Sequence, residues 1–417
     1  MTRGWRDRLR PGIGLGRDLN FLLSGQLVAT TGSRIFDIVL IWYALDQADD
    51  YATVGFLVFL RFVPYALFGL FCGWLSDRLN RRTLVVLAEL SRTVIFAAAG
   101  LALMTEADPL LVLAITAFLM TTTRTLSQPA VQGMLPQLAG GGALLRANAA
   151  LHGGMEMVGV AAPVIGGLLL AVLPASSVLF LVATCQFVAA ALAAAVRLSR
   201  ETRLAELRLA GFLAEYSELF RVLTRSRREI FSAIAVNVVA ILGVAGILSL
   251  LIPILVKDHL NAGPAALGTL WGVVALGTIL GAAVSIRLTA DRRERDMLLA
   301  WLGYGILIGA LFLPGHFIAV LVIGFVLGAV GAVADVLFAT LIQERMPQEH
   351  VSKTFAAFST FANVGEAVSA PLLALITTCF GIGAAFALGA LFPIVAALGG
   401  FVVLGRRASS ASLKSQG

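Results

Sequence analysis

The stretch TVGFLVFLRFVPYALFGLFC, residues 53–72, is followed at once by GWLSDRLNRR, residues 73–82. The first run has twenty residues and one charge, Arg61. A helix of this length crosses the ~30 Å hydrocarbon core of a bilayer. The second run contains four charged side chains: Asp77, Arg78, Arg81 and Arg82. An apolar run that ends in a charged turn predicts a transmembrane helix followed by a loop at the membrane surface.

The composition extends this prediction to the whole chain. Of the 417 residues, 59% are hydrophobic and 13% are charged, and the mean hydropathy is +0.92. A water-soluble protein normally carries about 25% charged residues. The composition therefore excludes a soluble domain and predicts an integral membrane protein.

Twelve runs are long and apolar enough to span a bilayer, and no alternating pattern typical of barrel strands is present. We expect an all-α membrane protein with twelve transmembrane helices, because helices satisfy their own backbone hydrogen bonds in lipid. The expected spans are 20–45, 53–76, 83–104, 109–134, 147–173, 176–197, 230–256, 265–288, 297–313, 316–342, 353–378 and 382–404.

The basic residues set the expected orientation. Of the 31 Lys and Arg residues, 26 fall on the side of the two termini, four lie inside spans, and Lys257 alone falls on the other side. Basic loops stay in the cytoplasm, so both termini are expected to be cytoplasmic. Nucleic-acid binding would require a soluble basic face, and the sequence has none.

Internal repetition predicts two pseudo-symmetric six-helix bundles. The pairs MLPQ (134–137) and RMPQ (345–348), APVIGG (162–167) and APLLAL (370–375), and DRLNRR (77–82) and DRRER (291–295) recur at offsets of 211, 208 and 214 residues. We therefore divide the chain into a cytoplasmic tail (1–19), a first bundle (20–197), a linker (198–229), a second bundle (230–404) and a second tail (405–417). The linker has apolar residues at helical spacing between charges, which predicts an amphipathic helix on the cytoplasmic surface, with partner docking as the alternative.

A family resemblance emerges from three stretches. The loop residues Gly73, Leu75, Asp77, Arg78, Arg81 and Arg82 resemble the loop motif of the major facilitator superfamily. Residues 25–45 and 147–167 look like the bacterial exporters that include the macrolide efflux proteins and the enterobactin exporter. The resemblance implies a bacterial inner-membrane transporter that works by alternating access, with the Asp77 loop as a latch that forms when the cytoplasmic side closes. Asn80 departs from the pattern, which has glycine there.

Several ionisable residues lie inside the expected spans, where a charge costs several kcal/mol and usually marks a transport pathway. Arg34 and Asp37, like Glu89 and Arg92, are spaced i, i+3 and can pair on one helix face. For the second pair we favour a local structural role. The candidate proton-coupling and cavity residues are Arg34, Asp37, Arg61, Arg124, His152, Glu156, Asp335 and Glu366.

The repeat relates some of these residues to one another. Arg124 and Asp335 are 211 residues apart, and Glu156 and Glu366 are 210 apart, so each pair occupies nearly equivalent positions in the two bundles. The resemblance implies that their four helices line a central cavity. We expect Arg124 and Asp335 to interact across the bundles in at least one conformation, because a lone charge in this setting is costly.

Two further features lie on the fifth span. His152 and Glu156 are spaced i, i+4 and can form a proton relay. Alternatively, His152 lies near the cytoplasmic boundary and simply faces water. Pro163, Gly166 and Gly167 resemble the end of the antiporter motif, with Ala162 in place of its usual glycine.

The function that we predict is secondary active export of a small amphipathic molecule, such as a drug, natural product or siderophore, coupled to proton antiport. A lysophospholipid flippase is the alternative, and a membrane enzyme or receptor is disfavoured because no catalytic constellation is evident. The chain has no GxxxxGK[ST] phosphate loop, and Cys72, Cys185 and Cys379 lack metal-ligand spacing. We expect no cofactor or metal, protons as coupling ion, contact with membrane lipid, no nucleic acid, and a monomer.

Overall fold

A computed structural model describes residues 16–76, 79–197, 218, 220–285, 287–288, 292–313 and 315–414. None of these residues is in a β-strand. The helices are α1 Arg17–Gln47, α2 Tyr51–Ser76, α3 Arg81–Ala102, α4 Pro109–Val172, α5 Ala175–Ala195, α7 Arg228–Gly246, η2 Ile247–Leu251, α8 Ile252–Ile254, η3 Leu255–His259, α9 Pro264–Ser285, α10 Arg293–Leu311, α11 Phe317–Arg345, α12 Gln348–Phe380 and α13 Ile382–Lys414.

Eleven helical segments in this described part are long and apolar enough to cross a membrane. They match eleven of the twelve expected spans, and α10 occupies the place of the remaining one, 297–313. Its first turn carries four charged residues, which is why it is not counted with the others. The 64-residue helix α4 contains two spans, Pro109–Ala139 and Gly153–Val172. The sequence predicted a break in the helix between the spans 109–134 and 147–173. In the structure, the residues between these spans are also helical.

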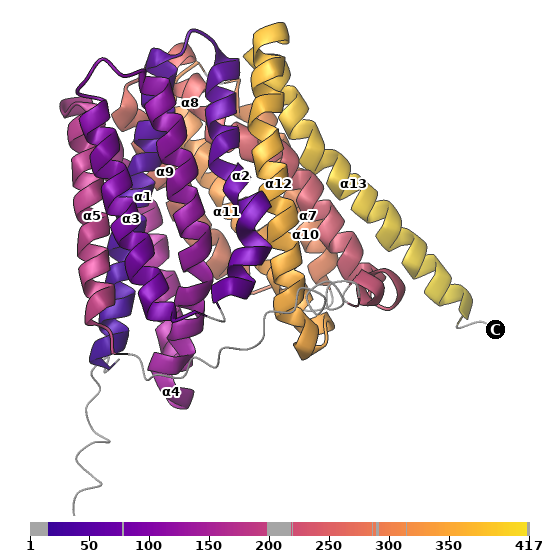
Figure 1. Ribbon diagram of the computed structural model, residues 1–417. Helices are drawn as coiled ribbons and strands as arrows, with labels where there is room; N and C mark the ends of the chain where they lie inside the picture. The colour runs from indigo at the N-terminus through magenta and orange to yellow at the C-terminus, as the bar shows by residue number, and fades with distance from the viewer. Residues whose placement is uncertain are drawn as a thin grey trace, which may run out of the picture.

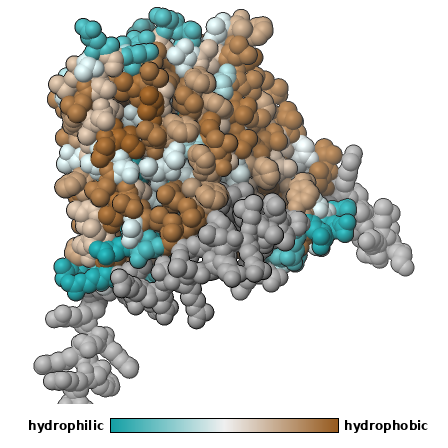
Figure 2. Space-filling model, viewed as in Figure 1, coloured by the Kyte–Doolittle hydropathy of each residue, from teal (hydrophilic) through white to brown (hydrophobic). Residues whose placement is uncertain are grey.

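The outer surface has the character that lipid requires. Large apolar side chains such as Leu67, Val94, Val172 and Leu313 are more than half exposed. Figure 2 shows on the visible face an apolar surface between polar residues at the two ends. So much exposed apolar surface would be unfavourable in water, and it favours burial in a bilayer.

The helices form two bundles that meet along two seams. In the first bundle α1 packs on α4 and α5, and α3 packs on α5; in the second, α9 packs on α11, and α13 packs on α7 and α10. Between the bundles, α2 packs on α12 and α4 packs on α9. Figure 1 shows α1, α3 and α5 of the first bundle on the left and α7, α10, α12 and α13 of the second on the right. We call the end where α1 begins and α13 ends the termini end, and the opposite end, where α1 ends and α2 begins, the far end.

Local sequence signals explain several helix ends. The Asn80 side chain accepts a hydrogen bond from the Thr83 backbone N–H at 3.1 Å and so caps α3. This role accounts for an asparagine where the family pattern has glycine. Asp108 caps α4 in the same way through the Leu110 N–H at 2.9 Å, and Pro109 follows at a position where its missing N–H costs nothing.

The seventh span is irregular. The segment Arg228–His259 is one apolar helical stretch, but it contains the π-helical turns η2 and η3. Just before η2, the Gly246 backbone N–H donates to the Ser369 hydroxyl of α12 at 2.7 Å. The π-helical turn η3 carries Lys257 and Asp258 at the far end. Such turns are frequent at functional sites.

Two predicted segments lie outside the membrane spans: the C-terminal tail and the linker between the bundles. The apolar part of α13 ends at Val403, next to the predicted end of the last span at 404, and the predicted tail from residue 405 continues the same helix to Lys414. Good helix formers such as Arg406, Arg407, Ala408 and Ala411 allow the helix to run beyond the apolar span. The predicted amphipathic linker lies largely outside the described residues, which begin again at 218 and 220.

Candidate functional site

A cavity of about 1100 Å³ lies between the two bundles. Its walls come from α1, α2 and α4 of the first bundle and from the seventh span, α9, α11 and α12 of the second. Eight of the predicted site residues line it: Arg34, Asp37, Arg61, Arg124, Glu156, Pro163, Asp335 and Glu366. Apolar side chains such as Met120, Trp271 and Phe358 share the walls with these charges.

The cavity is closed at the far end by glycines on both seams. A Cβ on Gly55 of α2 would lie 2.5 Å from the Ala374 Cβ of α12. A Cβ on Gly268 of α9 would overlap the carbonyl oxygen of Pro163 in α4. Because such glycines let helix backbones touch, the bundles are sealed at this level. The lining residues lie from there toward the termini end, and so the cavity faces that end.

These contacts also confirm the internal repeat. Pro163 belongs to APVIGG and Pro371 to APLLAL, and each stretch packs on a glycine at the start of a helix in the other bundle. Gly167, from the predicted antiporter-like motif, contacts Pro264 and Ala265 of α9, whereas Gly166 packs on the Ile35 backbone of α1. These glycines therefore lie at packed helix contacts, and Gly167 lies on the seam itself.

Asp37 has a closer partner than the sequence suggested. Its carboxylate lies 2.6 Å from the Arg61 guanidinium of α2 and 3.9 Å from Arg34 on its own helix. The pair expected from the spacing of Arg34 and Asp37 is therefore present, but it is not self-contained, because Arg61 is the closer partner of Asp37. Arg61 and Glu366 of α12 line the same cavity from opposite bundles, but of the described carboxylates only Asp37 lies within ion-pair distance of Arg61.

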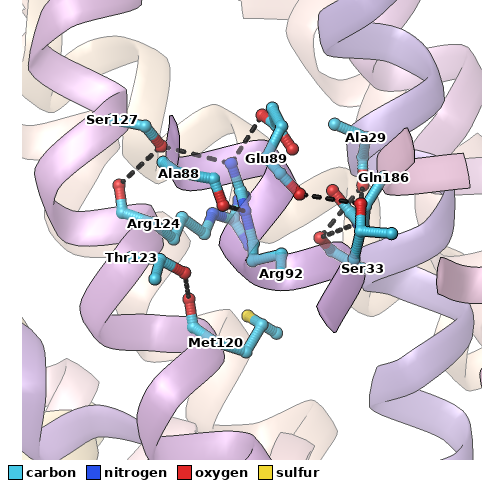
Figure 3. A network of polar contacts seen from close by, with 11 residues as sticks. Ala29, Ser33, Ala88, Glu89, Arg92, Met120, Thr123, Arg124, Ser127 and Gln186 are labelled. Carbon is cyan, nitrogen blue, oxygen red and sulfur yellow. Dashed lines mark hydrogen bonds and ion pairs between the residues drawn. The ribbon is translucent and has the colours of Figure 1, made fainter. Parts of the chain in front are cut away.

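Glu89 and Arg92 form the local pair that their spacing predicted. The Arg92 guanidinium donates to the Glu89 carboxylate at 2.5 Å, and the two side chains are only 1% and 4% exposed. Arg92 also donates to the Ser127 hydroxyl of α4 at 3.3 Å, which ties α3 to α4 (Figure 3). Neither residue of the pair lines the cavity.

The remaining cavity charges stand apart from one another. Among the described residues, the side chains of Arg124, Glu156, Asp335 and Glu366 have no ion pair within 4.0 Å and no hydrogen bond. The proposed contact between Arg124 and Asp335 is not formed in this conformation. It stays a prediction for another state of the cycle. The side chain of His152 lies outside the described part of the chain, so the relay with Glu156 also stays a prediction.

The loop motif is described only in part. Gly73 lies on α2, whereas Asp77 and Arg78 are outside the described residues, so the latch stays a prediction. Arg81 donates to the Gly133 carbonyl of α4 at 2.8 Å, and Arg82 donates to the Ala194 carbonyl of α5. Both arginines therefore bind helices of their own bundle: Arg82 binds the last turn of α5, where carbonyls lack intrahelical partners, and Arg81 binds a carbonyl inside the long helix α4.

Sequence reasoning missed the polar contacts that join the bundles at the far end. The Lys257 ammonium lies 2.5 Å from the Asp46 carboxylate and 5.9 Å from the centre of the Trp42 ring. The Tyr51 hydroxyl donates to Asp258 at 2.7 Å. A signal was present, because Lys257 is the only basic residue expected on that side.

Replacing Lys257 with glutamine is expected to open the far end in a larger fraction of molecules. The ion pair is partly exposed, so it contributes roughly 0.2–1 kcal/mol, and the population ratio should change up to about fivefold. Spin labels at Asp49 and His316, in a protein without its three cysteines, would report the separation of the bundles. Tyr51→Phe should act in the same direction. Arg345→Gln, which removes an ion pair to Glu294 inside one bundle, should leave the distances unchanged. Identical distances in Lys257→Gln and the parent would contradict the gate.

Comparison with known proteins gives consistent matches. The chain matches the description "Major Facilitator Superfamily" over residues 22–295 and 233–417. It is 22% identical to macrolide efflux protein A of Streptococcus pyogenes over 383 residues, which cover 90% of this chain and 93% of that protein. It is 24% identical over 387 residues to an uncharacterized MFS-type transporter of Sinorhizobium fredii, covering 90% and 92%. The crystal structure of the nucleoside transporter NupG shares the fold, with a TM-score of 0.73, 10% identity, and coverage of 93% of this chain and 99% of that chain.

Proposed function

Because the chain belongs to the major facilitator superfamily, we propose that it is a secondary active transporter that exports a small amphipathic molecule in exchange for protons. The family consists of transporters rather than enzymes. The observation that carries the proposal is the cavity of about 1100 Å³ between the bundles, in which apolar side chains and unpaired charges share the walls. A pocket of this size and mixed character suits a drug-sized amphipathic molecule.

The direction of export rests on the orientation of the chain. The basic loops and tails lie at the termini end, which favours a cytoplasmic location for that end in a bacterial inner membrane. The cavity faces the same end and is closed at the other. In this orientation the structure corresponds to the state that loads substrate from the cytoplasm. The similarity to macrolide efflux protein A supports efflux over uptake.

Proton coupling rests on the carboxyl groups of the cavity. Asp335 and Glu366 belong to the second bundle, which contributes no guanidinium to the cavity walls. Burial disfavours the charged form of a carboxyl group, and a nearby guanidinium favours it. Rocking of the bundles changes the distance from these acids to the arginines of the first bundle. Each acid would thereby gain and lose a proton once in a cycle.

The proposal is tested with the purified protein in liposomes. A pH gradient should drive accumulation of an amphipathic drug such as a fluorescent macrolide against its concentration gradient, and the drug should in turn drive proton movement. Collapse of the gradient by an ionophore should abolish accumulation. Accumulation that persists without any ion gradient would overturn proton-coupled transport. Parallel assays with a fluorescent lysophospholipid would show whether the substrate is a lipid.

The predicted contact between Arg124 and Asp335 provides a second test. Removing one partner leaves an uncompensated charge in a site of low polarity, so each single alanine variant should lose more folded protein and transport than the double variant. A coupling free energy of about 0.5–3 kcal/mol is expected for residues that meet. The four proteins would be compared by folded yield in detergent and by transport rate. Strict additivity would mean that the two side chains never interact.

A further inference from the structure

Two guanidinium groups in the cavity are not fully neutralised by a carboxylate of their own. Arg34 lies 3.9 Å from Asp37, whose nearer partner is Arg61 at 2.6 Å, and its side chain is half exposed to the cavity. Arg124 has no ion pair among the described residues. Both guanidiniums face the same cavity. An arginine cannot lose its proton in a protein, so both remain charged.

The other charges of the neighbourhood do not neutralise this pair. Asp37 and Glu89 both act electrostatically on Arg124, but Asp37 is bound to Arg61 at 2.6 Å and Glu89 to Arg92 at 2.5 Å. Tyr65 lines the same cavity and supplies a hydroxyl rather than a carboxylate. Glu156, Asp335 and Glu366 also line it, but among the described residues none of them forms an ion pair within 4.0 Å with Arg34 or Arg124. The region is therefore positively charged in this conformation.

Apolar side chains share the cavity with these two arginines. Trp271 of α9 and Phe358 of α12 line it and are partly exposed. Ile38 and Met120 also line it, but they are only 3% and 1% exposed and belong to its packed wall. Gln128, one turn on from Arg124, and Thr121 add hydrogen-bonding groups on the same wall.

We propose that Arg34 and Arg124 bind the anionic group of an amphipathic substrate, such as a carboxylate, sulfonate or phosphate, while partly exposed apolar side chains of the cavity such as Trp271 and Phe358 contact its apolar part. This inference rests on the proposed transport function and names its substrate class. Guanidinium groups pair with these anions through charge-assisted hydrogen bonds, which are about twice as strong as neutral ones. The site faces the termini end, where the substrate enters, and a later contact of Arg124 with Asp335 would displace the anion.

The test uses the full-length protein in phosphatidylcholine nanodiscs and the fluorescent probe dansylamino-undecanoic acid, with its methyl ester as an uncharged analogue. The acid should bind more tightly than the ester. Arg124→Gln and Arg34→Gln should each weaken binding of the acid by about ten- to a hundredfold, as expected for loss of charge-assisted hydrogen bonds, and should leave the ester unaffected. Arg287→Gln, which changes an exposed arginine outside the cavity, is the matched control.

Competition distinguishes the two sources of such an anion. Displacement by decanoate but not by lysophosphatidylglycerol would identify a soluble organic anion, and the reverse would identify a lipid headgroup. Lysophosphatidylcholine should displace poorly in either case. Arg124→Lys should retain part of the affinity, which separates loss of charge from loss of folding.

Equal binding of acid and ester to the parent protein would overturn the inference, whatever the variants do. Unchanged binding of the acid in both glutamine variants would also overturn it. Neither result bears on proton coupling, which is measured by gradient-driven accumulation. Conversely, an anion-selective site in a protein that shows no gradient-driven transport would preserve the site and reject the proposed coupling.

Discussion

Replacing Gly268 with alanine is expected to abolish most transport while leaving a folded protein. The added methyl group would overlap the Pro163 carbonyl oxygen, which belongs to a helix of the other bundle. Overpacking of this kind costs about 1–3 kcal/mol. The cost falls on the state with a closed far end, because the glycine contacts Pro163 across the seam. Since about 1.4 kcal/mol changes an equilibrium tenfold, the closed far end should become a minor state.

The spin labels at Asp49 and His316 would then report a wider separation, and transport would fall in parallel. Gly263→Ala is the matched control, since an added Cβ at this nearby far-end residue would meet no atom within 4 Å. Gly167→Ala should resemble Gly268→Ala, because its Cβ would overlap the Pro264 carbonyl on the same seam. Full transport activity in Gly268→Ala would show that closure at this level is not part of the cycle.

Neutralising the coupling carboxyl group is expected to abolish accumulation driven by a pH gradient and to spare downhill exchange of substrate. We expect at least one of Glu156→Gln, Asp335→Asn and Glu366→Gln to behave in this way. An amide retains the size of the side chain but cannot exchange a proton, so the transport cycle continues without coupling. With a pH gradient, substrate in proteoliposomes should then reach only equal internal and external concentrations, and substrate counterflow should remain near that of the parent.

Glu344→Gln provides a control, because this carboxylate pairs with Arg293 at the termini end and does not line the cavity. If all three cavity variants keep full uphill transport, the coupling group is elsewhere. Asp37 is then the next candidate, because it lines the cavity and pairs with Arg61.

The fold was predictable because lipid permits few structures. Apolar runs of spanning length specify helices, and the repeated APVIGG and APLLAL stretches specified two related bundles. Helix α2 runs from Tyr51 to Ser76, close to the expected 53–76. The π-helical turns of the seventh span were not predictable, because hydropathy carries no information on whether a turn contains one residue more.

The site was predictable in its members and less so in its contacts. A charge within an apolar span is visible in the sequence, and eight of the predicted residues share one cavity. The spacing of Arg34 and Asp37 shows that they can pair, but the shorter contact to Arg61 depends on how α1 and α2 are rotated. The contact of Lys257 with Asp46 joins residues 211 positions apart and depends on which end of the molecule is closed.

The glycine seams at the far end also insulate the membrane. A water-filled cavity that opens on one side brings the aqueous phase deep into the bilayer, so the remaining barrier must block the passage of ions on its own. At Gly55 and Gly268 the helices of the two bundles are in direct contact, with no room for even a Cβ between them. A side chain at either position would push the helices apart. A continuous chain of water molecules could then form, along which protons could pass. The absence of a side chain at Gly55 and Gly268 thus maintains the barrier that keeps the transporter from dissipating the ion gradient that it uses.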